Sequence, residues 1–342
     1  MHELRFCRLD EVALLQSYIA KEWRAEHIFV KSRKVLDFQY LDRKHSRYNV
    51  LIAYNTQTKE FDGILGFTLL SQYDKKLKDG WIWTSLWSAK KAYASLGLKL
   101  YRHLFELLKI QNTSTAGLSG DSIKFSKLFY DKIDKLYHFY IKNDNKKAFK
   151  LAIFKQNPPA KKPNLKLNLK KLSLEEFKNS TLKCHFTPQK SKTYFINRYL
   201  KHPFYKYEAL GVFKEGVLKA VFFIRIVRAE KAKAVLIVDF WGNVSGNLRE
   251  AFVEFLQKRR CEFVSLLCYV PKKEYFLKMG FSLPSDDELL PVYYEPFLKQ
   301  NVAIYFALTS KHKNASFFKG DSDQDRVNNI KCKFALSKPK EH

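Results

Sequence analysis

The sequence has few cysteines, glycines, prolines and methionines, with 5, 12, 10 and 2 of each. The five cysteines are Cys7, Cys184, Cys261, Cys268 and Cys332. Their number is odd and no two of them form a CxxC pair, so we expect neither a disulfide framework nor a zinc site. This cysteine usage fits a reducing compartment. No apolar run approaches the ~18 residues that a transmembrane helix needs. We therefore expect no transmembrane helix.

Acidic residues are also scarce, with 34 Asp and Glu against 62 Lys and Arg and a net charge of +28. Such an excess attracts polyanions such as nucleic acid, acidic membrane surfaces and phosphate-rich ligands. The lysines are scattered, however, apart from residues 142–171, where ten lysines surround Pro158, Pro159 and Pro163. No helix-turn-helix, RRM or zinc-finger signature is present. We therefore expect mostly solvated lysines and no stable nucleic-acid partner.

The chain has 342 residues, of which 46% are hydrophobic and 15% aromatic. This is too long for one ordinary core and predicts two domains. We place an N-terminal domain at 1–145, a Lys- and Pro-rich linker at 146–172, a C-terminal domain at 173–310 and a polar tail at 311–342. The first residues, MHELRFCRLDEVALL, carry charges throughout and lack the apolar segment of a secretion signal, so we expect a cytoplasmic protein.

Hydrophobic periodicity predicts the same order of elements in both halves of the chain. In the first half we expect strands at 4–9, 49–54, 63–71, 81–89, 114–118 and 137–142, with helices at 10–23, 27–40, 96–108 and 122–131. In the second half we expect helices at 174–179, 191–200, 248–259 and 273–279, with strands at 207–213, 218–227, 234–241, 263–269 and 302–309. The predicted fold class is α/β (α+β): two domains, each with a mixed, mostly antiparallel sheet flanked by helices.

Between the strand at 81–89 and the helix at 96–108 lies the stretch AYASLG, residues 92–97. Its position matches the Q/R-x-x-G-x-G/A turn of GNAT domains, although only Gly97 retains a glycine. The runs HIFVKSRKVLDFQY, GILGFTLLSQYD, IWTSLW, LGLKLYRHLFE, YFINRYLKHPFYKYEALGVF and KGDSDQDRVNN extend the similarity along the chain. The sequence thus resembles the bacterial tandem-GNAT nucleotide-sugar N-acyltransferases of surface-polysaccharide and lipopolysaccharide biosynthesis.

The resemblance implies a transferase that moves an acyl group, acetyl or a short hydroxyacyl, from acyl-CoA to an amine. The acceptor would be a nucleotide-linked amino-dideoxy sugar that attacks the thioester directly in a ternary complex. No metal and no nucleophilic side chain are needed, since backbone N–H groups polarise the carbonyl where the third strand of the domain parts from its neighbour. A homo-oligomer is compatible with these features.

We place the acyl-CoA diphosphate at the turn before the helix at 96–108, where free N–H groups and the helix dipole favour an anion. The residues of this turn are Ser95, Leu96, Gly97, Leu98 and Lys99. The alternative is an ordinary helix start with Ser95 as N-cap. The corresponding turn at 242–247 is more polar and lacks the basic flank of Lys90, Lys91 and Lys99, so we favour the first half for CoA.

Asp239 is the first catalytic candidate because it interrupts an otherwise apolar strand, AVLIVDFW. A buried carboxylate is costly without a partner. It could act as general base or accept a sugar hydroxyl. The alternative is a structural ion pair with Arg225 or Arg228 across the hairpin.

His202 and Tyr205 lie in the loop KHPFYKY, which can line a cleft between the domains. His202 is the second catalytic candidate because histidine accepts a proton near neutral pH. We assign Tyr205, His27 and Trp241 to substrate binding, with Trp241 placed to stack a nucleotide base. The alternative is a structural histidine for His27 and core packing for Trp241. For His202 and Tyr205 the alternative is a loop held by aromatic packing.

The tail contains the run DSDQDR at 321–326, from which we take Asp323 and Arg326 as substrate-binding residues. Its acid spacing resembles a calcium loop but lacks the later glycine and the glutamate at position twelve, so calcium is not expected. The resemblance implies a place at the interdomain cleft, where Arg326 could pair with a phosphate. The alternative is a solvated acidic tail.

Two other functions remain open at this point. One is an aminoacyl-tRNA-dependent transferase of the peptidoglycan-bridge type, which also has tandem GNAT domains and would suit a basic protein. Such proteins often carry a helical coiled-coil arm, and the sequence predicts none. The other is a non-enzymatic basic protein that binds nucleic acid.

Overall fold

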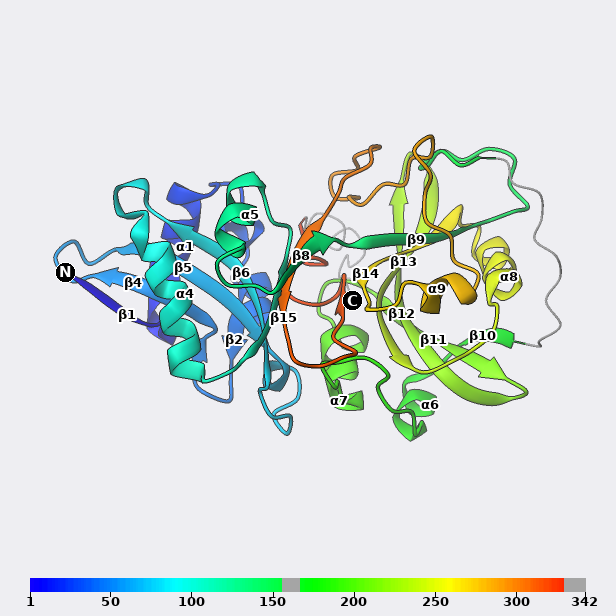
Figure 1. Ribbon diagram of the computed structural model, residues 1–342, viewed down its shortest axis with the longest axis horizontal. Coiled ribbons are helices and arrows are strands. Elements are labelled where there is room, and N and C mark those ends of the chain that lie inside the picture. Colours follow the sequence, from blue (N-terminus) through cyan, green and yellow to red (C-terminus); the bar gives the residue numbers. More distant parts are fainter. Residues whose placement is uncertain (156–166, 329–342) are drawn as a thin grey trace, which may run out of the picture.

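The computed structural model describes residues 1–155 and 167–328 and contains two seven-stranded sheets flanked by helices. The sheets lie side by side along the longest axis of the molecule (Figure 1). We call the part built around the first sheet the first half and the part built around the other sheet the second half. The predicted fold class is confirmed.

The first sheet runs in the order β1 (His2–Phe6), β4 (Val50–Asn55), β5 (Phe61–Leu69), β6 (Trp81–Ala89), β7 (Asn112–Ala116), β15 (Tyr305–Thr309) and β8 (Lys132–Lys135). Its helices are α1 (Val12–Glu22), α2 (Ile28–Lys31), α3 (Arg33–Tyr40), α4 (Ser95–Leu108) and α5 (Gly120–Ser126). Strands β2 (Leu41–Asp42) and β3 (Arg47–Tyr48) form a separate ribbon.

Alternation along β4 gives the first sheet a core on each face. Leu51 packs with Leu100 and Leu104 of α4, whereas the next residue, Ile52, packs with Leu15 of α1 and other residues of α1 to α3. The apolar face of α4 therefore covers one face of the sheet, and the apolar faces of α1 and α3 cover the other.

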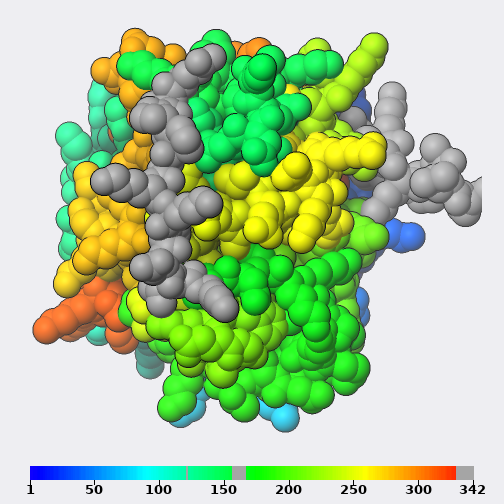
Figure 2. Space-filling model, turned by 90° about the vertical axis from the view of Figure 1, so that its right-hand side faces the viewer, coloured from blue at the N-terminus to red at the C-terminus, as the bar shows by residue number. Residues whose placement is uncertain are grey.

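The second sheet runs in the order β10 (Leu167–Lys171), β11 (Tyr207–Lys214), β12 (Val217–Ala229), β13 (Ala232–Gly242), β14 (Phe263–Tyr269) and β16 (Phe317–Phe318), with β9 (Tyr137–Lys142) also paired to β14. Its helices are α6 (Leu174–Asn179), α7 (Lys192–Phe195), α8 (Arg249–Arg259) and α9 (Glu274–Lys278). Helix α7 continues as a π-helix, Ile196–Leu200. Figure 2 looks onto the outer surface of this half, where α8 (yellow) lies near the centre.

The two halves exchange a strand. Strand β9 comes from the first half of the sequence but pairs antiparallel with β14 in the second sheet. Strand β15 comes from the second half of the sequence but lies between β7 and β8 in the first sheet. The expectation that 137–142 closes the first sheet and 302–309 the second was therefore wrong. The division of the chain into domains at 1–145 and 173–310 stays a prediction. The two sheets do not coincide with these ranges, because each contains a strand from the other range.

Both sheets contain the same irregularity. Strands β6 and β7 pair in parallel only as far as Trp83 and Ser114, and a bulge follows in β6, where Leu86 has φ 44°. Strands β13 and β14 pair in parallel only as far as Ile237 and Leu266, and a bulge follows in β13. A bulge bends its strand and ends regular pairing. We call the opening between β6 and β7 the first gap and that between β13 and β14 the second gap.

Two segments taken as linker and polar tail are partly core. The predicted linker contains β10 and the buried residues Leu151 and Ala152, while 156–166 lie outside the described residues. The predicted tail contains β16, and Asp321 and Asp325 are 0% and 2% exposed. The solvated-tail alternative is thus wrong for the run at 321–326, in which four residues are buried and two are half-buried. We call residues 316–328 the tail segment.

Candidate functional site at the junction of the two halves

The main chain of the tail segment occupies the second gap. The Gly320 N–H donates to the carbonyl of Val238 on β13 at 2.7 Å, and the Lys319 N–H donates to the carbonyl of Leu267 on β14 at 3.0 Å. Strand β16 pairs with β14 just before this point. A Cβ on Gly320 would lie 2.1 Å from the Tyr199 hydroxyl, so only glycine fits here. The second gap is filled by the protein itself.

In the first gap, the described part of the tail segment contacts the strands through its side chains and not through its main chain. The Ser322 hydroxyl donates to the Thr84 carbonyl on β6 at 3.4 Å. The Gln324 amide donates to the Ala116 carbonyl on β7 at 2.9 Å. The two gaps are therefore formed by similar strands. The second gap contains main chain of the tail segment, whereas the first is contacted by its side chains.

A buried charge cluster anchors the tail segment in the second half. The Lys190 ammonium lies 2.7 Å from the carboxylate of Asp239 and 2.6 Å from that of Asp321. The Tyr199 hydroxyl donates to Asp239 at 2.8 Å. Burial raises the pKa of the Asp321 carboxyl to about 6, although the nearby Lys190 charge opposes the shift. One cation thus holds two carboxylates from distant parts of the sequence.

These contacts bear on Asp239 as a candidate base. Its side chain is 0% exposed and both of its oxygens already accept hydrogen bonds, the second from the Phe240 N–H. The geometry favours the ion-pair alternative for Asp239. Its partner is Lys190, however, and not Arg225 or Arg228 as the sequence suggested.

Arg225 instead binds the tail segment at Asp325. Its guanidinium donates to both Asp325 oxygens at 2.9–3.1 Å, and the Tyr207 hydroxyl donates to the same carboxylate at 2.7 Å. Arg225 also lies 3.7 Å from Glu295 and stacks over the Tyr205 ring, 4.3 Å from its centroid. This second anchor lies at the edge of a large cavity.

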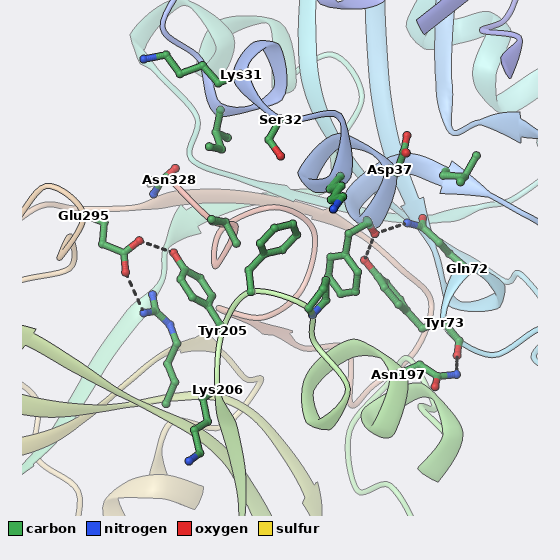
Figure 3. A pocket seen from close by; sticks show the side chains of 18 of the residues that line it. Lys31, Ser32, Asp37, Gln72, Tyr73, Asn197, Tyr205, Lys206, Glu295 and Asn328 are labelled. Atoms are coloured by element: carbon green, nitrogen blue, oxygen red, sulfur yellow. Dashed lines mark hydrogen bonds and ion pairs between the residues drawn. The ribbon is translucent and has the colours of Figure 1, made fainter. Parts of the chain in front are cut away.

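That cavity, of about 1960 Å³, lies between the two halves. In Figure 3 its upper wall carries Lys31, Asp37 and Gln72 from the first half, and its lower wall carries Asn197 and Tyr205 from the second. The last described residues of the tail segment, Val327 and Asn328, also line it. Cavities between two parts of a fold are a usual place for a ligand.

Unpaired cations dominate the cavity. Within the described chain, no ion pair or hydrogen bond engages the charged side-chain ends of these lining residues: Lys34, Arg43, Lys75, Lys76, Lys206 and Arg228. The four lining acids, in contrast, all have partners in the protein: Glu26 with Lys31, Asp37 with Tyr48, Asp74 with Ser191, and Glu295 with Tyr205. The cavity therefore offers positive charge to a ligand.

Aromatic side chains line the same cavity. Phe38, Tyr73, Phe204, Tyr205 and Tyr294 come from both halves. The Tyr205 hydroxyl donates to Glu295 at 2.6 Å, which fixes its ring (Figure 3). Aromatic faces beside free cations suit a ligand that carries both a ring and anionic groups.

Helix α3 connects this cavity to the first gap through three consecutive residues. Phe38 lines the cavity, Gln39 donates to the carbonyl of Ser322 at 3.0 Å, and the Tyr40 hydroxyl lies 2.8 Å from that of Ser85 on β6. The tail segment thus lies between the cavity and the first gap.

The turn predicted to bind CoA lies at the N-terminus of α4, which follows β6 after the short 3-10 helix Lys91–Tyr93. Ser95 is exposed and is the first residue of the helix, and no side chain caps this end, so the N-cap alternative for Ser95 is wrong. The Gly97 carbonyl accepts a hydrogen bond from the Trp87 indole at 2.9 Å. Leu96 is buried in the core, whereas Lys99 is exposed.

Fewer lysines beside this turn are free of acidic partners than the sequence suggested. Lys90 is bound by Asp62 at 2.8 Å and Glu60 at 3.2 Å. Lys91 and Lys99 are exposed and form no ion pair in the described chain. These two lysines remain beside the turn. The turn does not line the large cavity, so the two candidate sites are separate.

The predicted histidines hold loops. The His27 ring accepts from the Phe29 N–H at 3.3 Å and caps α2; burial, with Arg326 and Arg24 nearby, lowers its pKa to about 4. The His202 ring accepts from the N–H groups of Phe204 and Tyr205 at 3.1 and 2.9 Å. Both contacts are those of loop-fixing side chains, and neither residue lines the cavity.

The remaining predicted residues divide between core and cavity edge. Trp241 is 4% exposed and packs on Phe177 in the second half, away from the cavity lining. Asp323 and Arg326 pair with each other at 3.0 Å. Tyr205 is the one predicted substrate residue among the described cavity-lining residues.

Two solved structures share this fold over most of the chain. A GCN5-related N-acetyltransferase from Anabaena variabilis has a TM-score of 0.51 at 10% identity, covering 90% of this chain and 72% of its own. A conserved Enterococcus faecalis protein of unknown function, described as a probable N-acyltransferase, has a TM-score of 0.51 at 9% identity with the same coverage. No family model and no curated protein matches the sequence. The chain therefore has a GNAT-like fold.

In the described residues no helix is both long and apolar enough to cross a membrane. The same residues contain no group of three or more His, Cys, Asp or Glu side chains arranged to hold a metal ion.

Proposed function

We propose that the protein is an N-acyltransferase that uses acyl-CoA as donor and binds it in the first half. The observation that carries this proposal is that β6 parts from β7 and then leads, through the 3-10 helix Lys91–Tyr93, to the N-terminus of α4, which no side chain caps. A thioester between parted strands meets main-chain N–H groups, and a diphosphate suits a helix N-terminus.

The difference between the gaps supports the choice of the first half. A donor in the second gap would have to displace the main chain of the tail segment, including the hydrogen bond from Gly320 to Val238. At the corresponding helix start, Arg249 is already bound by Asp144 at 2.9 Å. The first half has Lys91 and Lys99 exposed instead.

We further propose that the acceptor is a nucleotide-linked amino sugar in the large cavity. The free cations Lys75, Lys76, Lys206 and Arg228 would bind the phosphates, and the aromatic rings would bind the base. The acceptor amine would reach the first gap past the tail segment, since α3 contacts both sites.

In the reaction the neutral amine nitrogen attacks the thioester carbonyl carbon and forms the C–N bond. The C–S bond then breaks, and the CoA sulfur leaves as a thiolate. The proton lost by the amine ends on that sulfur, directly or through water. The protein's part is to hold the two reactants in contact and to polarise the carbonyl.

A thermal-shift titration with acetyl-CoA, tRNA and dTDP, each alone, tests the proposal. We expect stabilisation by acetyl-CoA and by dTDP. Lys75→Glu should weaken the dTDP effect and leave that of acetyl-CoA unchanged, because Lys75 lines only the cavity. Stabilisation by tRNA but not by acetyl-CoA would contradict the proposal and favour an aminoacyl-tRNA-dependent enzyme or a protein that binds nucleic acid.

A further inference from the structure

We infer that Ser322 and Gln324 form the wall of the acyl site and restrict the donor to a short acyl chain. The inference rests on the proposed function, because it concerns the donor in the first gap. It adds a role for two residues of the tail segment, which comes from the far end of the described chain.

Ser322 lies where the two strands begin to part. The last parallel pair is Trp83 with Ser114, and the next residue on β6 is Thr84. The Thr84 carbonyl accepts from the Thr115 hydroxyl at 2.9 Å and from the Ser322 hydroxyl at 3.4 Å. The narrow end of the first gap is therefore closed by a hydroxyl from each of two segments.

Gln324 closes the side of the gap along β7. Its amide binds the Ala116 carbonyl at 2.9 Å, one residue past Thr115. The following residue, Gly117, has φ 81°, and a Cβ there would lie 2.9 Å from the Gln324 amide nitrogen. A glycine at this position thus allows both the turn and the close approach of Gln324.

The position of Ser322 is fixed from both halves. Its carbonyl accepts from Gln39 of α3 at 3.0 Å and from Arg198 of the π-helix at 3.1 Å. The residue has φ 55°, a left-handed conformation that costs serine more than glycine. The serine side chain is therefore held in the gap at a backbone position where glycine would fit with less strain.

These contacts limit the room for an acyl group. A thioester between β6 and β7 would direct its acyl chain towards the narrow end of the gap, where Ser322 and Gln324 are bound to the strand carbonyls. An acetyl group adds one carbon beyond the carbonyl, whereas longer chains would have to displace these side chains. The favoured donors are accordingly acetyl-CoA and donors of similar size.

The test compares acetyl-CoA, butanoyl-CoA and hexanoyl-CoA on the full chain. Dissociation constants are measured by isothermal titration calorimetry for wild type, Ser322→Gly and Gln324→Ala. Wild type should bind acetyl-CoA about tenfold more tightly than hexanoyl-CoA, and Gln324→Ala should remove most of this preference. Ser322→Gly should act in the same direction by a smaller factor, and its backbone tolerates glycine.

Gln300→Ala is the matched control, because this glutamine is exposed and its described hydrogen bond joins it to Leu298 and not to Ser322, Gln324, β6 or β7. Its acyl-length preference should equal that of wild type. An unchanged preference in both tail variants, with acyl-CoA still bound, would overturn this inference and leave the proposed function intact. If no acyl-CoA of any length binds to wild type, the proposed function itself fails.

Discussion

The two halves contain the same parted strands, yet only the second is closed by main chain. In the second gap the backbone of Lys319 and Gly320 bonds both strands, and Lys190 anchors the next residues. In the first gap the side chains of Ser322 and Gln324 touch single carbonyls. The comparison teaches that the protein's own main chain fills one of two similar gaps, and it leaves the other for the donor that we propose.

The largest expected effect is at the anchor of the second gap. Lys190→Met leaves two buried carboxylates, Asp239 and Asp321, without their cation. We expect the free energy of unfolding to fall by about 3–5 kcal/mol. Urea denaturation checks this, with the exposed Lys258→Met as control. A loss no larger than that of the control would show that the cluster does not hold the tail segment.

The next effect concerns the backbone in the second gap. Gly320→Ala would place a Cβ 2.8 Å from the Val238 carbonyl and closer still to Tyr199, so the tail segment must shift. We expect a loss of about 1–3 kcal/mol in the free energy of unfolding.

Gly120→Ala is the matched control for this variant, because a Cβ there meets nothing within 4 Å. It should change stability by no more than about 0.5 kcal/mol. Equal stability of the two variants would mean that the second gap tolerates displacement of the tail segment, and the contrast between the gaps would fail.

A smaller effect is a difference between the two halves in how their stability depends on pH. In the first half the pKa of His27 falls from 6.5 to about 4, so its contribution to stability is present above pH 6.5 and is lost as the pH falls towards 4. In the second half the pKa of Asp321 rises from 3.8 to about 6, so its contribution is present below pH 4 and is lost as the pH rises through 6.

Unfolding free energies of wild type, His27→Asn and Asp321→Asn between pH 4 and 6.5 check these opposite signs. As the pH rises, wild type should gain stability relative to His27→Asn. Over the same range it should lose stability relative to Asp321→Asn. Asparagine keeps the cap at His27, because it is a favoured N-cap residue. Slopes of the same sign would contradict the burial that we describe for one of the two sites.

The smallest effect concerns the turn at the start of α4, where we propose that the CoA diphosphate binds. Lys99→Glu should weaken acetyl-CoA binding about three- to tenfold at low salt, because it reverses a charge beside the start of α4. Lys258→Glu on α8, an exposed lysine of the second half, should leave binding unchanged. Calorimetric titration at two salt concentrations measures both. Equal effects of the two variants would remove the distinction between the halves.

Much of the fold could be predicted from hydrophobic periodicity. The ranges of β6, β9 and β14 agree with the predicted strands to the residue. Strands β8 and β10 were missed because KIDK and LNLKK are short and rich in lysine. The exchange of β9 and β15 could not be predicted, since local sequence specifies a strand but not the sheet that it joins.

The candidate site was less predictable, because its parts are far apart in the sequence. Asp321 and Asp325 look like solvated acids until Lys190 and Arg225 are found beside them. One feature of the sequence pointed to this site: a carboxylate such as Asp239 inside an apolar strand needs a cationic partner. The sequence did not identify Lys190 as that partner. The cavity collects single residues from many loops, and Tyr205 was the only one of our site residues that it contains in the described chain.

A crystal structure of the protein with acetyl-CoA would test the central claim most directly. We predict one acetyl-CoA per chain, with its diphosphate at the N-terminus of α4 beside Lys91 and Lys99 and its thioester between β6 and β7. The tail segment should keep its place in the second gap. A diphosphate bound before α8, with the tail segment displaced from β13 and β14, would contradict the account.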